Sequence, residues 1–497
     1  MKTSGLNPYL PFWETVPDGE PHVFGDRVYI YGSHDRLGGI SFCEEDYVCW
    51  SAPVEEPGVW TCEGVIYKKM QDPLNGAPYG KTLPEIGMPL GTEENPHLLY
   101  APDVAQGPDG RYYLYYALDF VNVISVAVCD TPAGQYEFLD FVRREDGTIP
   151  DAGRWFDPAI LSEESGNYLY YGFAPARKFP GMEQVIFPGA MMVKLAQDMH
   201  TIISEPKCVA NGIDTAKGTS YEAHPFFEAS SIRKLGNRYY FVYSSLQGHE
   251  LCYGTADTPE GPFAYKGVIV SNGDLGYEGN TLAVNYTGNN HGGLERIGNR
   301  LYIFWHRHTH GTAFSRQGCA DEVKILEDGT IPQIEITSCG LHDGPLPAKG
   351  AYDSCIACHL TEADREQVGQ VVMSGPGEAV PELPEEMPYI TEEADETGEK
   401  GLKPYIRNLR TGSAAGFKYF QFEGTESRIT VELRGLGCLE VRADSPDPQA
   451  GTMVGSAAVD SKNWKHVTTG LQVEAGKHAL YFLVKEGTVD FASFEIA

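Results

Sequence analysis

One stretch near the middle of the chain decides the fold. It reads Tyr221-Glu-Ala-His-Pro-Phe-Phe-Glu228-Ala-Ser-Ser-Ile-Arg-Lys234 and continues as Leu235-Gly-Asn-Arg-Tyr-Tyr-Phe-Val-Tyr-Ser-Ser245. A lone acidic residue, Glu228, lies between two aromatic residues and a run of small ones, and an aromatic-rich segment begins ten positions later. This layout recurs along the chain, and internal repeats of this kind decide an architecture.

The recurring unit is an aromatic hairpin. Each copy has a turn pair such as Gly236-Asn237, followed by a segment rich in Tyr, Phe and Ile, which are residues that favour strands. The aromatic segments cover residues 27–33, 111–117, 167–173, 238–244 and 300–306. One distinctive polar residue precedes each segment by eight to ten positions, namely Asp18, Asp103, Asp157, Glu228 and His291.

The matched offset places one polar group at a similar point of every repeat. Radial repetition of four-stranded sheets gives a β-propeller, in which the first strands line the central channel. The sequence therefore predicts an all-β chain that contains a five-bladed propeller, with four carboxylates and one imidazole at one mouth of the channel. Residues 1–17 are expected to supply a strand that closes the ring, and the insertion at 68–96 is expected to shape a pocket.

The sequence changes character near residue 345. Residues 372–401 are rich in Pro, Glu and Gly and are predicted to form a long loop. Short alternating segments between 415 and 496 then predict an antiparallel β-sandwich, with residues 353–360 as its first strand. We therefore expect a propeller domain over residues 1–345 and an accessory sandwich over residues 346–497.

Composition narrows the choice of partner and compartment. The net charge of −31 argues against nucleic acid or an anionic membrane as a partner, since both require a basic surface. No apolar run of 18 residues is present, so no transmembrane helix is expected. The first residues lack the apolar core of an export signal, and the eleven cysteines are odd in number and scattered, which favours a cytoplasmic protein with reduced thiols.

Paired carboxylates point to glycoside hydrolysis. That reaction needs one protonated acid and one ionised base, and a third carboxylate nearby can raise the pKa of the acid. Asp157 and Glu228 each precede small residues that leave room for a ligand, whereas Asp18 lies in a Pro-Asp-Gly-Glu-Pro segment. Each acid alone could be a turn or cap residue, but their repeated placement favours a catalytic role.

The motifs around these acids resemble glycoside hydrolase family 43, which has a five-bladed propeller fold. The resemblance covers roughly residues 7–335 and rests on four segments: 18–35, 101–103, 156–160 and 227–229. It implies that Asp18 is the general base, Asp157 the residue that tunes the acid, Glu228 the general acid, and Asp103 a substrate-binding residue.

One position departs from the family pattern. Asp18 is followed by Gly19 where the family usually has Pro, which leaves Glu20, directly before Pro21, as a rival base. The offset from the aromatic segment favours Asp18.

The resemblance also bears on basic residues of the last repeat. A histidine in the channel often coordinates a structural cation or a water in this family, so His291 is a candidate ligand for Ca²⁺; an ordinary hydrogen bond is the alternative. His306, His308 and His310 alternate as zinc ligands can, but we expect them to line the pocket, with His306 binding substrate. Arg316 resembles an arginine that contacts the terminal sugar, with a surface salt bridge as the alternative.

Two further signals carry less weight. Cys355-Ile-Ala-Cys358-His359 matches a haem-attachment string, but no export signal accompanies it and no second cysteine pair suits zinc. Residues 412–423 resemble a carbohydrate-binding module that accompanies many such enzymes. Its aromatic residues Tyr419, Phe420 and Trp464 could stack on sugars, although a structural role is expected because alternating aromatic residues usually belong to a core.

These observations predict an inverting exo-glycosidase that removes arabinofuranosyl or xylosyl units from short oligosaccharides and needs no organic cofactor. A mannoside phosphorylase on a related propeller is one alternative, with phosphate bound by His306, Arg307, His308 and Arg316. A non-catalytic glycan-binding propeller is another. A fructan hydrolase is disfavoured because its Asn-Asp-Pro-Asn motif is absent.

Overall fold

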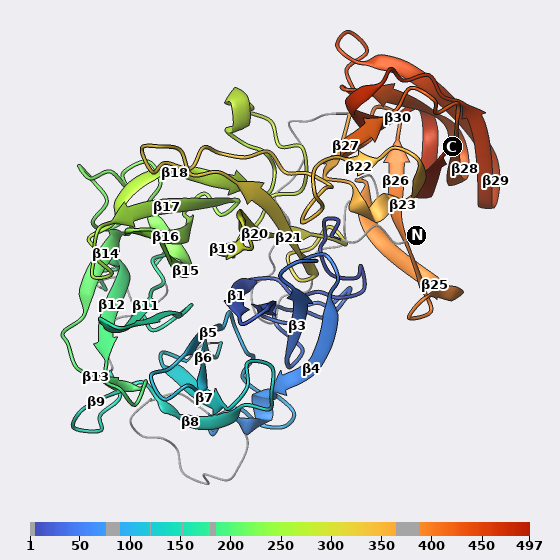
Figure 1. Ribbon diagram of the computed structural model, residues 1–497. Coiled ribbons are helices and arrows are strands. Elements are labelled where there is room, and N and C mark those ends of the chain that lie inside the picture. Colours follow the sequence, from blue (N-terminus) through green and yellow to red (C-terminus); the bar gives the residue numbers. More distant parts are fainter. Residues whose placement is uncertain (1–4, 76–89, 120, 151–153, 179–184, 364–386) are drawn as a thin grey trace.

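The structure, a computed structural model, describes residues 5–75, 90–119, 121–150, 154–178, 185–363 and 387–497. Five sheets surround a central axis, and a larger sheet lies beside them at the C-terminal end of the chain (Figure 1). The predicted five-bladed β-propeller followed by a β-sandwich is confirmed. None of the helices in the described ranges is long and apolar enough to cross a membrane.

The blades follow one another along the chain, each running from an inner strand outward. Blade one contains β1 (Glu20–Phe24), β2 (Arg27–Tyr31), β3 (Tyr47–Pro53) and β4 (Thr61–Tyr67), with the 3-10 helix η1 (Lys69–Gln71) after it. Blade two contains β5 (Asp103–Gln106), β6 (Tyr112–Ala117), β7 (Ile124–Cys129) and β8 (Glu137–Phe141). Blade three contains β10 (Ala159–Glu163), β11 (Gly166–Tyr171), β12 (Gly189–Leu195), β13 (Thr201–Ile202) and β14 (Lys207–Asn211), and β9 (Arg143–Arg144) pairs with β13.

The last two blades complete the ring. Blade four contains β15 (Phe226–Leu235), β16 (Arg238–Ser245), β17 (Glu250–Ala256) and β18 (Ala264–Ser271). Blade five contains only three strands among the described residues, β19 (Leu294–Ile297), β20 (Arg300–His308) and β21 (Arg316–Val323), and the 3-10 helix η2 (Tyr277–Gly279) precedes it. Each inner strand contacts the inner strands of both neighbouring blades, with β1 against β19 where the ring closes.

Local sequence explains the hairpins and the packing between blades. In blade four the turn pair lies between Leu235 and Arg238, which are paired in register, and Gly236 has a left-handed φ of 67° that suits a tight turn. Aromatic side chains of neighbouring sheets fill the space between blades, as where the ring centroids of Tyr170 on β11 and Phe241 on β16 lie 5.8 Å apart. The regularly spaced aromatic residues of the sequence are therefore the residues whose side chains pack between the blades.

Residues at the start of the chain close the ring against blade five, although not as a strand. The backbone N–H of Tyr9 donates to the carbonyl oxygen of Gly318 on β21 at 3.2 Å. The side chain of Asn7 donates to Ala320 O and to Asp321 Oδ2, at 3.0 and 3.1 Å. The segment around Asn7 and Tyr9 thus takes the place of a fourth strand in blade five, although it lies more than 300 residues from that blade along the chain.

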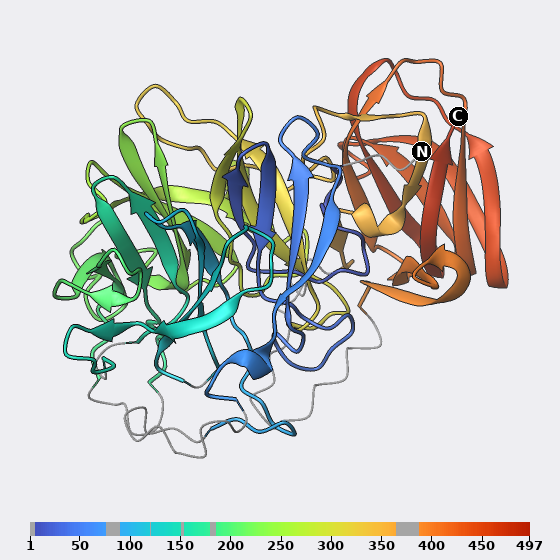
Figure 2. The same ribbon diagram turned by 60° about the horizontal axis from the view of Figure 1, so that its bottom comes forward.

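The sandwich is built on long bent strands (Figure 2). Its elements are β22 (Leu346–Pro347), β23 (Gly350–Asp353), η3 (Ser354–Ile356), β24 (His359–Thr361), β25 (Tyr389–Glu399), β26 (Leu402–Arg410), β27 (Ala414–Phe422), β28 (Arg428–Ala443), β29 (Thr452–Gly470) and β30 (Gly476–Ile496). β30 pairs with β23, β26, β27 and β28, so it links both halves of the sandwich. Tyr286, Ala313 and Phe314 of the propeller belong to the sandwich's hydrophobic core, so the two parts share apolar surface.

Two local predictions for this region are wrong. Residues 353–360 do not form one strand, because residues 354–356 make the 3-10 turn η3 between β23 and β24. Residues 389–399 belong to strand β25 and not to a long loop, because β25 gains a partner, β26, that composition does not reveal. Residues 372–386 of that expected loop, and residues 76–89 of the expected pocket insertion, lie outside the described residues.

Candidate active site

A pocket of about 420 Å³ opens where the inner strands begin. Asp18, Asp157 and His291 lie just before β1, β10 and β19, Glu228 lies within β15, and Arg316 begins β21; all five line this pocket. The polar residues of four of the five repeats therefore meet at one mouth of the channel, as the repeat offsets predicted.

Asp18 is held as a buried carboxylate. Its Oδ1 accepts a hydrogen bond from Arg316 Nη1 at 2.9 Å, and its Oδ2 accepts one from Ser33 Oγ at 2.6 Å. His306 Nδ1 lies 3.3 Å from Oδ1. Burial by itself raises the pKa of Asp18, but the charge of Arg316 and the contact with His306 outweigh it and hold the pKa well below the usual range. Asp18 is therefore ionised at neutral pH.

A β-bulge aims Glu228 into the pocket. The register of β15 against β16 shifts on both sides of this residue, and Ala229 has a left-handed φ of 67°. Bulges of this kind redirect a side chain next to an active site. The N–H of Ala229 donates to Asp157 Oδ2 at 2.9 Å, so the bulge is tied to blade three.

The surroundings of Glu228 and Asp157 favour the protonated form of each side chain. Burial, and next the negative charge of Asp18, raise the pKa of Glu228 to about 8, although Arg316 acts in the opposite direction. Burial, and next the charges of Glu228 and Asp18, raise the pKa of Asp157 well above its ordinary value. Carboxyls with opposite protonation states at pH 7 are the signature of acid–base catalysis.

Backbone strain accompanies these acids. Asp18 and Asp157 adopt left-handed φ values of 56° and 45°, which residues other than glycine rarely do. Strained conformations concentrate at functional sites, where the surrounding structure holds them in place.

Arg316 is the cation of the pocket. Its side chain is only 2% exposed, which excludes the surface salt bridge that was the alternative interpretation. Nε and Nη2 donate to the two oxygens of Asp35 at 2.8 and 2.9 Å, and the guanidinium lies 4.8 Å from the centroid of the Phe42 ring. Asp35 is the important residue that sequence reasoning missed, although it ends the segment 18–35 that carries the family resemblance.

His306 and His308 lie behind the pocket and not on its surface. Each donates through Nε2 to Asn289, a pocket-lining residue: His306 to its backbone carbonyl oxygen at 2.8 Å and His308 to its side-chain oxygen at 3.0 Å. His306 is fully buried, so in this structure it contacts Asp18 and Asn289. His310 leaves the strand and bonds Glu392 Oε2 of the sandwich at 2.9 Å, so the three histidines do not converge on a metal.

Asp103 and Glu20 also lie beneath the pocket. Asp103 is fully buried and accepts from Ile160 N at 2.7 Å, while its other oxygen lies 2.6 Å from His22 Nε2. Glu20 Oε2 accepts from Arg233 Nη2 and from Ser231 Oγ, both at 3.1 Å. Of the two rival bases, Asp18 is therefore the one on the pocket surface.

Five aromatic residues form a large part of the remaining pocket wall. Phe42, Tyr100, Phe156, Phe173 and Phe227 line it, and they come from blades one to four. Phe156 and Phe227 directly precede the acids Asp157 and Glu228. These aromatic residues are visible in the sequence, but nothing in the sequence indicates that their side chains line the same pocket.

The sandwich aromatics singled out earlier are engaged by the protein. Phe420 is fully buried in the core, and Tyr419 OH donates to Glu335 Oε2 at 2.6 Å. The ring of Trp464 is covered by Lys403 and Arg434, at 4.6 and 4.4 Å from its centroid. Their contacts agree with the structural role that we expected.

A five-bladed propeller whose channel mouth holds an ionised carboxylate and a protonated carboxyl defines the class of glycoside hydrolases. Comparison with known proteins narrows this class, because the profile described as glycosyl hydrolases family 43 matches residues 84–331. A curated "Xylosidase/arabinosidase" of Thermoclostridium stercorarium is 45% identical over 511 aligned positions, which cover 100% of this chain and 99% of that protein. The chain belongs to glycoside hydrolase family 43.

More distant relatives carry similar names. A "Xylosidase/arabinosidase" of Bacteroides ovatus is 29% identical and covers 66% of this chain and 97% of its own length. Among solved structures, a family 43 β-xylosidase/α-arabinofuranosidase from a compost microbial metagenome, in complex with xylotriose, is 26% identical with a TM-score of 0.50. That similarity covers 67% of this chain and 97% of the other.

Proposed function

We propose that this protein is an inverting exo-glycosidase that removes α-L-arabinofuranosyl or β-D-xylosyl units from the ends of oligosaccharides. The observation that carries the proposal is the opposite displacement of two pKa values in one pocket, downward for Asp18 and upward for Glu228. The printed names of the relatives, which are xylosidases and arabinosidases, support the choice of sugars.

The mechanism follows from these protonation states. Glu228 gives its proton to the glycosidic oxygen as the bond from that oxygen to the anomeric carbon breaks. Asp18 takes a proton from a water that attacks the same carbon from the opposite face, so the configuration is inverted. Asp157 holds the N–H of Ala229 and thereby positions the neighbouring acid.

The lining favours a neutral sugar. Five aromatic rings offer apolar faces, and the Arg316 side chain, Thr287 and Asn289 offer polar groups beside the carboxyls. Sugars bind to such mixed surfaces through stacking on rings and hydrogen bonds from a few convergent polar groups. A pocket of about 420 Å³ has room for a terminal sugar and its attacking water, which supports exo action.

Phosphorolysis is less well supported. Arg316 is the only lysine or arginine among the described residues that line the pocket, and Asp18 and Asp35 already neutralise it. Arg307 points to the sandwich, where its guanidinium donates to Ala357 O at 3.0 Å. A phosphate would therefore meet no unpaired cation among these residues.

We also propose that His291 holds a cation or an ordered water in the channel. Burial lowers the pKa of His291 to about 4, so the imidazole is neutral, and its Nε2 is buried without a hydrogen-bond partner in the described part of the chain. A neutral nitrogen can bind a cation or a water. Calcium takes six to eight oxygen ligands, whereas the carboxylate nearest to His291 is Asp157, at 3.8 Å, so waters would have to supply most of the shell.

We also propose that the protein acts in a reducing compartment such as the cytoplasm. All eleven cysteines are free thiols, and most of them are buried in strands and loops without a disulfide. Reduced buried thiols of this kind are usual in cytoplasmic proteins.

The decisive test is turnover of p-nitrophenyl α-L-arabinofuranoside and p-nitrophenyl β-D-xyloside by the wild type and by Glu228→Gln. Activity on either substrate that falls by about 10²–10⁴-fold in the variant supports the assignment. Proton NMR of the sugar released in the first minutes reports whether its anomeric configuration is inverted. Full activity of the variant, or retention of configuration, would refute the mechanism.

A further inference from the structure

Three groups in the described residues bring together His, Cys, Asp or Glu ligand atoms within 4.8 Å of one another. Two of them are already occupied by cations of the protein. Arg233 pairs with Glu20 in the group Glu20, His22 and Asp103, and Lys418 pairs with Glu335 in the group Asp274, Glu335 and His359. A metal ion at either place would be repelled by the neighbouring side-chain charge.

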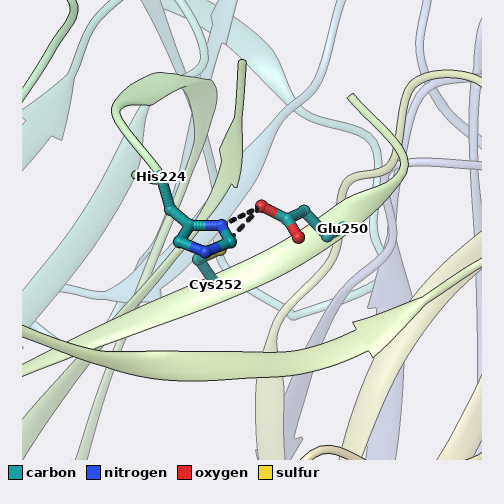
Figure 3. A group of neighbouring side chains, drawn as sticks. All are labelled: His224, Glu250 and Cys252. Atoms are coloured by element: carbon teal, nitrogen blue, oxygen red, sulfur yellow. Dashed lines mark hydrogen bonds and ion pairs between the residues drawn. The ribbon is translucent and has the colours of Figure 1, made fainter. Parts of the chain in front are cut away.

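The third group lies in blade four and consists of His224, Glu250 and Cys252 (Figure 3). Glu250 and Cys252 lie two residues apart on β17, so their side chains share one face of the sheet. His224 comes from the segment before β15 and turns its ring onto them. His224 Nδ1 lies 2.5 Å from Glu250 Oε1, and Cys252 Sγ donates to the same oxygen at 3.4 Å.

The surroundings hold these side chains in place. The ring of His224 stacks on Tyr265, with centroids 5.1 Å apart and planes 10° apart. Ser245 Oγ donates to Glu250 Oε1 at 2.5 Å, which fixes the carboxylate. Outer hydrogen bonds of this kind orient the ligands of metal sites.

The charges around the group also favour a cation. Glu250 Oε1 accepts hydrogen bonds from Ser245 Oγ and Cys252 Sγ, as the oxygen of a carboxylate does. In the described part of the chain its only ion-pair partner is His224, which loses that role when it becomes a neutral ligand. Tyr243 and Tyr265, which also face the group, carry no charge at neutral pH.

We propose that His224, Glu250 and Cys252 bind one zinc ion, with a water as the fourth ligand. One nitrogen, one carboxylate oxygen and one sulfur are the donors that zinc prefers, at about 2.0–2.3 Å in a tetrahedron. The three atoms are close enough that the imidazole needs only to swing slightly away from the carboxylate to admit the ion. Cys252 and Glu250 are buried, whereas the side chain of His224 is 28% exposed, so the ion and its water enter along the histidine edge.

The balance of protons is simple. The Cys252 thiol donates to Glu250 Oε1, so in the absence of metal the thiol carries its proton. Zinc displaces that proton and the one shared between His224 and Glu250, and both are released to solvent. Binding therefore tightens as the pH rises.

The three proposed ligands lie beside the pocket but do not line it. Leu246, Gln247 and Gly248 line the pocket and form the loop that joins Ser245 to Glu250. His224 precedes Glu228 by four residues. A zinc ion would clamp the base of this loop to the segment that carries the general acid, and so would stabilise one wall of the pocket.

Cobalt(II) is the most direct probe, because a thiolate bound to cobalt gives an intense charge-transfer band in the near ultraviolet. We expect purified full-length protein, stripped with chelator, to take up one Co²⁺ per chain with this band, and added Zn²⁺ to abolish it. Cys252→Ser should lose the band. Cys319→Ser, which alters another buried strand cysteine of the propeller, should keep it.

A second variant guards against misfolding of the first. His224→Gln alters the most exposed of the three ligands, and we expect it to weaken zinc binding at least tenfold in competition with a chromophoric chelator. The proposal is overturned if the wild type shows no thiolate band, if the band survives in Cys252→Ser, or if His224→Gln binds zinc as tightly as the wild type. Any of these results would leave the group as an ion pair beside a buried thiol.

Discussion

Removal of the cation beside the general base should move the pH optimum upward. The change is the double substitution Arg316→Gln with Asp35→Asn, which replaces a buried ion pair by two amides. Removing Arg316 alone would leave the fully buried charge of Asp35 uncompensated, a loss that costs about 3–5 kcal/mol of stability. The double variant avoids this loss and isolates the effect on Asp18.

The magnitude follows from the distance of 2.9 Å between Arg316 Nη1 and Asp18 Oδ1. Coulomb's law with an effective dielectric constant of about 20 gives about 6 kcal/mol for unit charges at this separation, or about four pKa units as a ceiling. His306 still favours the ionised form, so the full ceiling is not reached. We expect the acid limb of the pH profile to enter the measurable range, at about pH 3–5.

The alkaline limb should move in the same direction. Arg316 lowers the pKa of Glu228, which the structure places at about 8, so its removal raises that pKa further. The profile of kcat/KM between pH 3 and pH 10, measured on the p-nitrophenyl glycoside that the wild type cleaves, should therefore shift to higher pH on both sides. Circular dichroism at each pH separates this shift from unfolding.

A matched control is available in the sandwich. Arg434 Nε donates to Asp490 Oδ2 at 2.8 Å, so Arg434→Gln with Asp490→Asn removes an arginine–aspartate pair far from the pocket. Its pH profile should match that of the wild type. An unchanged acid limb in the Arg316 and Asp35 variant would refute the assignment of Asp18 as a base that is kept ionised by Arg316.

Three further outcomes test the roles assigned to single residues. Asp18→Asn should lower kcat/KM by about 10²–10⁴-fold, whereas Glu20→Gln, beneath the pocket, should stay within about threefold; equal losses would reopen the choice of base. Glu392→Gln weakens the hydrogen bond between Glu392 and His310, which connects the sandwich to the loop before Arg316. We expect KM to rise and the free energy of unfolding to fall by no more than about 1 kcal/mol. An unchanged KM would argue against a link between the sandwich and the pocket. Phe417→Ala empties a fully buried ring position of the sandwich core and should cost about 3–5 kcal/mol in urea unfolding, a value that a loss below 1 kcal/mol would contradict.

The blades could be predicted from the sequence because their signal is local. Turn pairs and aromatic alternation specify each hairpin, and the fixed offset of Asp18, Asp157 and Glu228 from those hairpins places the acids at one end of the inner strands. These features depend on contacts between residues less than about twenty positions apart.

The rest depends on contacts that local pattern does not encode. Asp35 meets Arg316 across 281 positions, and a short polar segment gives no sign of that partner. Strand β25 looks like a loop because its composition is acidic and rich in turn-forming residues, and only its pairing with β26 makes it a strand. His306 has the residue type and spacing of a pocket residue, but its side chain is fully buried and donates to the carbonyl oxygen of Asn289, which lines the pocket in its place.

The hydrogen bond from Arg316 to Asp18 joins residues 298 positions apart, at the place where blade five meets blade one. The contact that joins the first and last blades is thus also the contact that keeps the general base ionised. A chain emerging from the ribosome with four finished blades already contains all three acids, yet it lacks the cation that keeps the first of them charged. Closure of the ring therefore sets the low pKa of Asp18, and the position of the acid limb of the pH profile reports whether the ring has closed.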